Sequence, residues 1–129
     1  MTMPRRRNSL LQALEYFRTI DAEIVVNDIL VFLYICENEG LNISELARLA
    51  RLTEATASRR ARALAGPDIP FPVAPSMGLV EMFQGSDGRQ RLIYLTDRGR
   101  EARDRVETLI AAAIPLAPPP ARAVERLAG

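Results

Sequence analysis

The segment from Asn42 to Leu64, with the sequence NISELARLARLTEATASRRARAL, constrains the fold of this chain most strongly. Asn42 is a favourable N-cap residue, and Glu45 follows three residues later, which is a capping-box pattern for a first helix. Thr53 is a suitable N-cap for a second helix. Apolar residues recur at three- and four-residue spacing in both halves. The segment therefore predicts two short helices joined by a tight turn, a helix-turn-helix.

The second of these predicted helices, residues 53–65, has two chemically distinct faces. Ala57, Ala61 and Leu64 recur every three or four residues and form an inward face that is small enough for close packing. Residues 48–62 contain five arginines, at positions 48, 51, 59, 60 and 62, against one acidic residue, Glu54. Guanidinium groups bind phosphate and guanine in a bidentate manner. The outward face, Glu54, Ala55, Ser58, Arg59 and Arg62, therefore predicts contact with the major groove of DNA.

Two alternatives remain open for these arginines. A run of charge is usually a solvated helix face, and the use of arginine to the exclusion of lysine is explained more simply by genomic base composition than by function. The outward position of Arg59 and Arg62 nevertheless favours DNA. Thr56 lies nearer the edge of the face, and Arg60 points elsewhere, toward either a phosphate or another part of the protein.

Two helices are predicted before the helix-turn-helix. The first covers residues 8–20, with Ser9 as its N-cap. Residues 28–36 are almost continuously apolar, and a strand is possible there on propensity alone. We prefer a helix, because Asn27 or Asp28 can begin it and Gly40 can end it.

A hairpin and a long helix are predicted after the helix-turn-helix. The proline-rich residues 67–75 predict an extended, ordered loop. Two short strands, 79–83 and 91–95, flank the turn signal Asp87-Gly88 and form a wing with an arginine-bearing tip. Thr96 is the predicted N-cap of a helix that runs from residue 97 to about residue 113, and residues 121–127 predict a last short helix.

Composition excludes most catalytic chemistry. The chain has 129 residues, one cysteine and no histidine, which excludes an intrachain disulfide, a Cys/His zinc site and a nucleophile activated by histidine. We therefore expect no enzyme, no catalytic residue, no metal and no cofactor. Cys36 is expected to be a small buried hydrophobe rather than a redox sensor. No apolar run is long enough to span a bilayer and no secretory signal is evident, so a cytoplasmic location is expected.

Together these motifs resemble the MarR-type winged-helix transcriptional regulators, from about Ser9 to Ile110. The resemblance rests on ISELARLARLTEATASR, GLVE, SDGR and IYLTDRGRE. It implies a homodimer whose first and last helices interlock and which binds a short palindromic operator. It also implies that Asp87 holds Arg89 for the minor groove, and that an unidentified anionic or phenolic effector, or oxidation of a cysteine, releases DNA.

The predicted fold is mainly α with a small β-hairpin: a winged helix-turn-helix domain with N- and C-terminal dimerisation helices. A single domain covers residues 1–129, with dimerisation helices at 8–26 and 97–128, a DNA-binding core at 28–96, a helix-turn-helix at 42–65 and a wing at 79–95. The predicted DNA contacts are Thr53, Glu54, Ala55, Thr56, Ser58, Arg59, Arg62, Asp87, Arg89 and Arg91. The predicted dimer interface consists of two apolar stripes that a lone core would leave exposed: Leu10, Leu14, Phe17, Val106, Leu109 and Ile110.

The predicted function is sequence-specific binding of double-stranded DNA as a homodimeric transcriptional regulator, a repressor, with helix 53–65 in the major groove and wing 85–91 at the minor groove. The alternative is a winged-helix module that contacts another protein and does not recognise a DNA sequence. Retention on heparin or random DNA at low salt separates the two, because a protein-contact module should show little retention.

Overall fold

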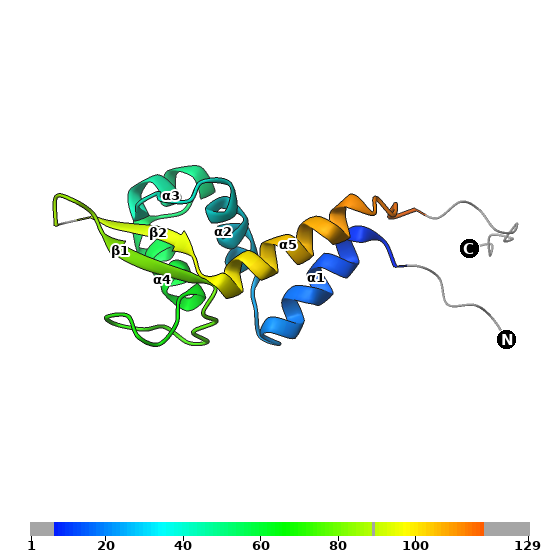
Figure 1. Ribbon diagram of the computed structural model, residues 1–129, viewed down its shortest axis with the longest axis horizontal. Helices are drawn as coiled ribbons and strands as arrows, with labels where there is room; N and C mark the ends of the chain where they lie inside the picture. The colour runs from blue at the N-terminus through cyan, green and yellow to red at the C-terminus, as the bar shows by residue number, and fades with distance from the viewer. Residues whose placement is uncertain (1–6, 89, 118–129) are drawn as a thin grey trace, which may run out of the picture.

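The computed structural model describes residues 7–88 and 90–117, which form five helices and a two-stranded hairpin (Figure 1). The helices are α1 (Ser9–Ile20), α2 (Val26–Glu37), α3 (Ile43–Ala50), α4 (Glu54–Leu64) and α5 (Asp97–Ala111), and the strands are β1 (Val80–Gln84) and β2 (Arg91–Leu95). The predicted mainly α fold with a small hairpin is confirmed. Helices α1 and α5 pack side by side at one end of the molecule, and the hairpin lies at the other end (Figure 1).

The N-terminus of α1 is joined to the segment that follows α5. Asn8, not Ser9, caps α1, because the Asn8 side chain accepts a hydrogen bond from the Leu11 amide at 2.7 Å. Ser9 instead pairs with Ile114: its amide donates to the Ile114 carbonyl at 3.0 Å, and its hydroxyl accepts from the Ile114 amide at 2.9 Å. The N-cap prediction for Ser9 is therefore wrong. The sequence could not reveal the pairing of Ser9 with Ile114, because the two residues are about a hundred positions apart.

The apolar segment after α1 is a helix, as preferred, and it begins slightly earlier than predicted. Helix α2 starts at Val26, and Asp28 acts from its first turn by accepting a hydrogen bond from the Val25 amide at 3.3 Å. Val31, Phe32 and Ile35 are fully buried. This helix supports the domain from its centre, since α3, α4 and β2 all pack against it.

The helix-turn-helix forms as its caps predict. The Asn42 side chain accepts from the Glu45 amide at 2.9 Å, and the Glu45 carboxylate accepts from the Asn42 amide at 3.1 Å, which completes the capping box. Arg51 makes the turn in the left-handed region, with φ of 57°. Leu46 and Ala47 of α3 are buried, whereas Leu49 is 42% exposed.

The hairpin is antiparallel, with Val80 opposite Leu95 and Gln84 opposite Arg91. The predicted Asp87-Gly88 turn is present, and Gly88 has φ of 74°, a conformation that favours glycine. The hairpin strands lead directly into α5, where the Thr96 hydroxyl caps the helix by accepting from the Gly99 amide at 3.0 Å and donates to the Gly78 carbonyl at 2.6 Å. A Cβ at Gly99 would overlap the Leu79 carbonyl, so this close approach requires glycine.

The ends of the helices differ from the predicted limits by a few residues. Helix α1 ends at Ile20, so the predicted range 8–26 contains this helix and the turn into α2. Helix α5 ends at Ala111, two residues earlier than expected. The predicted short helix at 121–127 lies outside the described residues. Among the described residues, no helix is long and apolar enough to cross a membrane.

Candidate nucleic-acid interface

Helix α4 is held in place by a buried alanine face and a firm N-cap. The predicted inward residues Ala57, Ala61 and Leu64 are fully buried, which lets α4 pack closely against α2 and α3. The Thr53 hydroxyl accepts from the Thr56 amide at 3.1 Å and satisfies one of the free amides of the first turn. The opposite face of α4 is therefore available to a partner.

An ion pair fixes the rotation of α4 about its axis. Arg60 Nη1 lies 3.0 Å from Asp28 Oδ1 on α2, and the two side chains are 20% and 3% exposed. Arg60 is therefore an intraprotein contact, one of the two roles left open by the sequence. Asp28 is the only buried charged residue in the described part of the chain. Sequence reasoning missed its role, because the two residues are 32 positions apart.

Three arginines of the predicted DNA-contact set remain free to meet a partner. Arg59 and Arg91 are exposed and Arg62 is half-buried. None of the three forms an ion pair with another residue in the described ranges 7–88 and 90–117. Arginines elsewhere do find acids: Arg18 pairs with Glu15 at 2.7 Å, and Arg100 pairs with Asp97 at 3.3 Å. Arg59, Arg62 and Arg91 therefore keep their guanidiniums available on α4 and at the start of β2.

Some of the predicted DNA-contact residues at the N-terminus of α4 also form hydrogen bonds within the protein. The Ser44 hydroxyl donates to Glu54 Oε1 at 2.7 Å, which joins the two helices of the helix-turn-helix. The Thr53 hydroxyl also donates to the Thr56 hydroxyl at 2.9 Å. Ala55 is exposed and Ser58 is half-buried. The structure therefore brings all the α4 members onto one helix, but it gives Glu54 and Thr53 structural contacts as well.

The wing is anchored to the helix-turn-helix through its base. Asn42 Nδ2 donates to Gln90 Oε1 at 3.2 Å, and the Gln90 amide donates to Asp87 Oδ1 at 3.2 Å. The amide side chain of Gln84 donates to the Gly88 carbonyl at 2.6 Å and closes the turn. Arg89 lies outside the described residues, so its predicted role stays a prediction.

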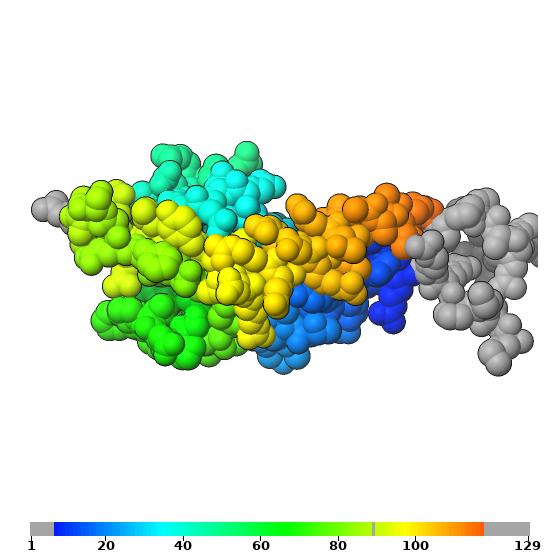
Figure 2. All heavy atoms as spheres, in the orientation of Figure 1, coloured from blue at the N-terminus to red at the C-terminus, as the bar shows by residue number. Residues whose placement is uncertain are grey.

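A hollow of about 220 Å³ lies between α4, the hairpin and the proline-rich loop. Ser58 and Arg62 line it from α4, and Met82 and Arg91 line it from the hairpin. Phe71 of the loop also lines it, although its side chain is 80% exposed. The loop and the hairpin both protrude at the end of the molecule opposite α1 and α5 (Figures 1 and 2). The sequence predicted an ordered loop but not that it would border the DNA-contact face.

The predicted dimer residues divide into two groups. Phe17 is 1% exposed, Val106 is 4% exposed and Leu109 is 8% exposed, because α1 and α5 pack against each other within the chain. These three side chains belong to the intrachain packing, which corrects the expectation that a lone core would leave both stripes exposed. Leu10 and Ile110 are 62% and 57% exposed and are available to a second copy, as is the half-exposed Leu14.

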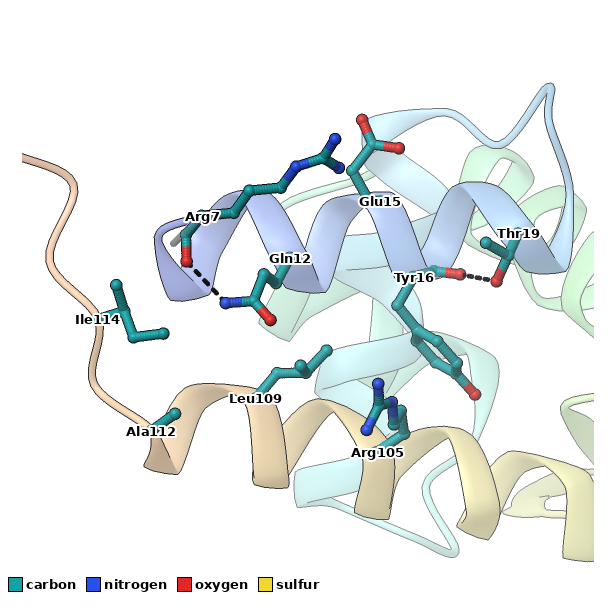
Figure 3. Close-up of a pocket in the computed structure, with 9 residues that line it drawn as sticks. All are labelled: Arg7, Gln12, Glu15, Tyr16, Thr19, Arg105, Leu109, Ala112 and Ile114. Carbon is teal, nitrogen blue, oxygen red and sulfur yellow. Dashed lines mark hydrogen bonds between the residues drawn. The ribbon is translucent and has the colours of Figure 1, made fainter. Parts of the chain in front are cut away.

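A second hollow, of about 640 Å³, lies between α1 and α5 (Figure 3). Tyr16 of α1 and Arg105 of α5 extend into the space between the two helices, and Leu109 forms part of its apolar wall (Figure 3). Gln12 donates to the Arg7 carbonyl at 2.6 Å at the far end. The lining combines the cationic residues Arg7 and Arg105 with Tyr16 and apolar groups, and it also includes Glu15, which pairs with Arg18.

Cys36 is free and partly buried among apolar neighbours on α2. Burial raises the pKa of the Cys36 thiol from 9.0 to about 12, and the nearby Arg103 offsets only part of this effect. The thiol therefore has little thiolate character at neutral pH. Within the described residues, no cluster of His, Cys, Asp and Glu side chains is suited to a metal ion.

Several solved structures share this architecture. RV1404 from Mycobacterium tuberculosis superimposes with a TM-score of 0.62 at 16% identity, over 80% of this chain and 64% of that one. MepR from S. aureus in its complex with DNA gives a TM-score of 0.64 at 17% identity, over 80% of this chain and 77% of that one. A MarR transcriptional regulator from Methanosarcina mazei Go1 gives 0.57 at 14% identity, over 81% of this chain and 70% of that one.

Likeness at this level of identity shows the fold. Comparison with models of protein families finds no match, and neither does comparison with curated proteins. The relation is therefore carried by the three-dimensional arrangement: two helices and a capped turn, a hairpin that follows them, and a pair of long helices packed at the far end. This chain has the winged helix-turn-helix fold of the MarR-type transcriptional regulators.

Proposed function

We propose that this protein is a transcriptional regulator that binds double-stranded DNA in a sequence-specific manner, with α4 in the major groove and the wing at the adjacent minor groove. The observation that carries the proposal is the set of free guanidiniums, Arg59, Arg62 and Arg91, on the surface shared by α4 and the hairpin. MepR, which has this fold, is solved in complex with DNA. An α-helix with exposed arginines fits the width of the major groove, where arginine binds guanine in a bidentate manner.

We propose a homodimer built on the exposed apolar residues of α1 and α5. Leu10 and Leu14 are four residues apart on one side of α1, and Ile110 lies near the end of α5. Exposed apolar patches are rare on monomers. A twofold axis there would place two α4 helices roughly 34 Å apart, so the operator would be palindromic with half-sites ~10 base pairs apart, centre to centre.

The wing supplies the second groove contact in this proposal. Asp87 and Gly88 form the tight tip, and Arg89 follows them in the sequence. A narrow minor groove concentrates negative potential and attracts an inserted arginine. Replacing Arg89 with alanine should lower affinity by about tenfold, which is on the order of 1–2 kcal/mol, and should leave the unfolding temperature unchanged.

The hollow between α1 and α5 is the proposed site of a small organic anion that regulates DNA binding. Its volume of about 640 Å³ suits a small ligand. The guanidinium of Arg105 can bind a carboxylate and the Tyr16 hydroxyl can bind a second polar group. An effector that binds the DNA-free form better would release the operator, and the protein would then act as a repressor in the cytoplasm.

The test is DNA binding by fluorescence anisotropy with Arg59→Ala and a matched control. Arg59→Ala should cost about 1–3 kcal/mol on the preferred sequence and should relax preference at one position in each half-site. Arg18→Ala removes the same charge from α1, where the side chain is 64% exposed and pairs with Glu15. The control should bind nearly as the parent does. If no duplex binds at low salt, the protein-contact function replaces this proposal.

A further inference from the structure

The hollow beside α4 joins two of the proposed DNA-contact residues, Arg62 and Arg91, to a residue that has no role so far, Phe71. Arg62 and Arg91, which form no ion pair with another described residue, line it together with the strongly exposed aromatic residue Phe71. These residues come from a helix, a strand and a loop that the fold brings to one place. Two guanidiniums can bind an anionic group, whereas an exposed aromatic ring can pack on an apolar surface. The occupant of the hollow should therefore have an anionic group next to an apolar surface.

Phe71 is held outward by the backbone at a conformational cost. Its φ is 55°, in the left-handed region that a bulky residue seldom adopts. Such strain persists only where the surrounding structure imposes it, and it is often associated with function. The side chain nevertheless remains 80% exposed, so the loop does not use it to build the core. The ring is therefore available to a partner.

The position of the hollow identifies that partner. If α4 enters the major groove and the wing enters the adjacent minor groove, the sugar-phosphate strand that divides the two grooves must pass between α4 and the hairpin. The hollow lies in that interval, with Ser58 and Arg62 on the α4 side and Met82 and Arg91 on the hairpin side. A DNA strand carries an anionic phosphate next to an apolar deoxyribose, which matches the two kinds of group present.

We propose that the proline-rich loop is a third DNA-binding element, and that Phe71 packs on a deoxyribose while Arg62 and Arg91 hold the neighbouring phosphate. This proposal rests on the proposed function. The clamp contributes affinity and fixes the register of α4, but it does not read bases, because phosphates and sugars are the same at every position. Arg59, which does not line the hollow, remains the candidate for base contact.

The experiment compares Phe71→Ala, Phe71→Leu and Leu116→Ala in the full chain. Leu116 is the matched control, because it is 74% exposed and follows α5 at the opposite end of the molecule. Phe71→Ala should weaken binding to the preferred duplex and to an unrelated duplex by the same factor, about tenfold. Phe71→Leu should recover most of the loss because it keeps an apolar surface. Leu116→Ala should bind as the parent does.

Two further readouts distinguish a sugar-phosphate contact from a change in folding. Hydroxyl radicals attack deoxyribose, so Phe71→Ala should lose protection at one or two sugars in each half-site and keep the rest of the footprint. The slope of log affinity against log salt should be unchanged for Phe71→Ala, since no charge is lost. Arg91→Gln should lower that slope by ~0.9 for each phosphate contact removed.

Three outcomes would overturn the inference. Equal affinity of Phe71→Ala and the parent would show that the loop does not touch DNA. A loss confined to one base identity would make Phe71 a base contact instead of a sugar contact. A loss accompanied by a lower unfolding midpoint and an intact footprint would make its role structural. If the parent bound no duplex at all, the proposed function itself would fail. That result is distinct from the three outcomes above, in which the parent binds DNA.

Discussion

Replacing Arg60 with alanine should destabilise the protein far more than its position on the arginine-rich helix suggests. The change leaves the Asp28 carboxylate buried, with its side chain 3% exposed and its ion-pair partner removed. Breaking a buried pair in this way typically costs 3–5 kcal/mol. The Arg60 side chain is 20% exposed, so water can reach part of the site. We therefore expect a loss of about 2–4 kcal/mol in the free energy of unfolding.

Removing the acidic partner should cost less free energy of unfolding than removing Arg60, and replacing both partners with apolar residues should recover most of the stability. Asp28→Ala removes the ion pair and the hydrogen bond to the Val25 amide, but Arg60 can then turn toward water, so about 1–2 kcal/mol is expected. Asp28→Leu combined with Arg60→Met replaces the pair by apolar groups and should lie within ~1 kcal/mol of the parent. Arg100→Ala breaks a solvent-accessible pair with Asp97 and a longer one with Glu39, and it should change stability by no more than about 1 kcal/mol.

Urea unfolding followed by circular dichroism measures these differences through the transition midpoint at constant m-value. The reasoning would be refuted if Arg60→Ala and Arg100→Ala lost similar, small amounts of stability. It would also be refuted if the paired substitution were as unstable as Arg60→Ala, because the cost would then come from packing and not from a stranded charge.

Three further predictions follow from burial and backbone contacts. Leu10→Asp should convert a dimer to a folded monomer in light scattering, whereas Leu109→Asp should unfold the chain, because Leu10 is 62% exposed and Leu109 is 8% exposed; equal effects would contradict the assignment. Gly99→Ala should lower the midpoint of urea unfolding by at least as much as a typical core substitution, about 1–3 kcal/mol, because its Cβ would overlap the Leu79 carbonyl; an unchanged midpoint would show that α5 can shift. Folded Cys36 should react with a thiol reagent at pH 8 about two to three orders of magnitude more slowly than the unfolded chain, since its pKa is raised to about 12. The same shift should reduce stability as the pH rises from 9 toward 12, because the native state retains the proton that the unfolded state loses; a rising stability there would contradict it.

Local signals in the sequence predicted most of the elements correctly. The Asn42 capping box, the Thr53 and Thr96 N-caps and the Asp87-Gly88 turn each depend on residues at most three positions apart. Such contacts are set by local backbone geometry and can therefore be predicted from neighbouring residues in the sequence. The helix-turn-helix and the wing, which carry most of the proposed DNA contacts, are assembled from these signals.

Contacts between distant residues account for what the sequence missed. Ser9 was predicted to be an N-cap, but it forms hydrogen bonds with Ile114. The sequence left two roles open for Arg60, and its ion pair with Asp28 decides between them. An apolar stripe shows that a helix face is buried, not what covers it, so Phe17 was assigned to a second copy although it packs within the chain. The outward position of Phe71 depends on a left-handed backbone that the proline-rich sequence does not encode locally.

Selection of bound sequences from a random duplex pool tests the central claim most directly. If two copies present α4 to successive major grooves, the enriched sequences should share an inverted repeat with half-site centres ~10 base pairs apart. Arg59→Ala should enrich the same repeat with one position relaxed in each half-site. Recovery of an unenriched pool, or of a single motif without inverted symmetry, would contradict sequence-specific binding by a dimer through α4.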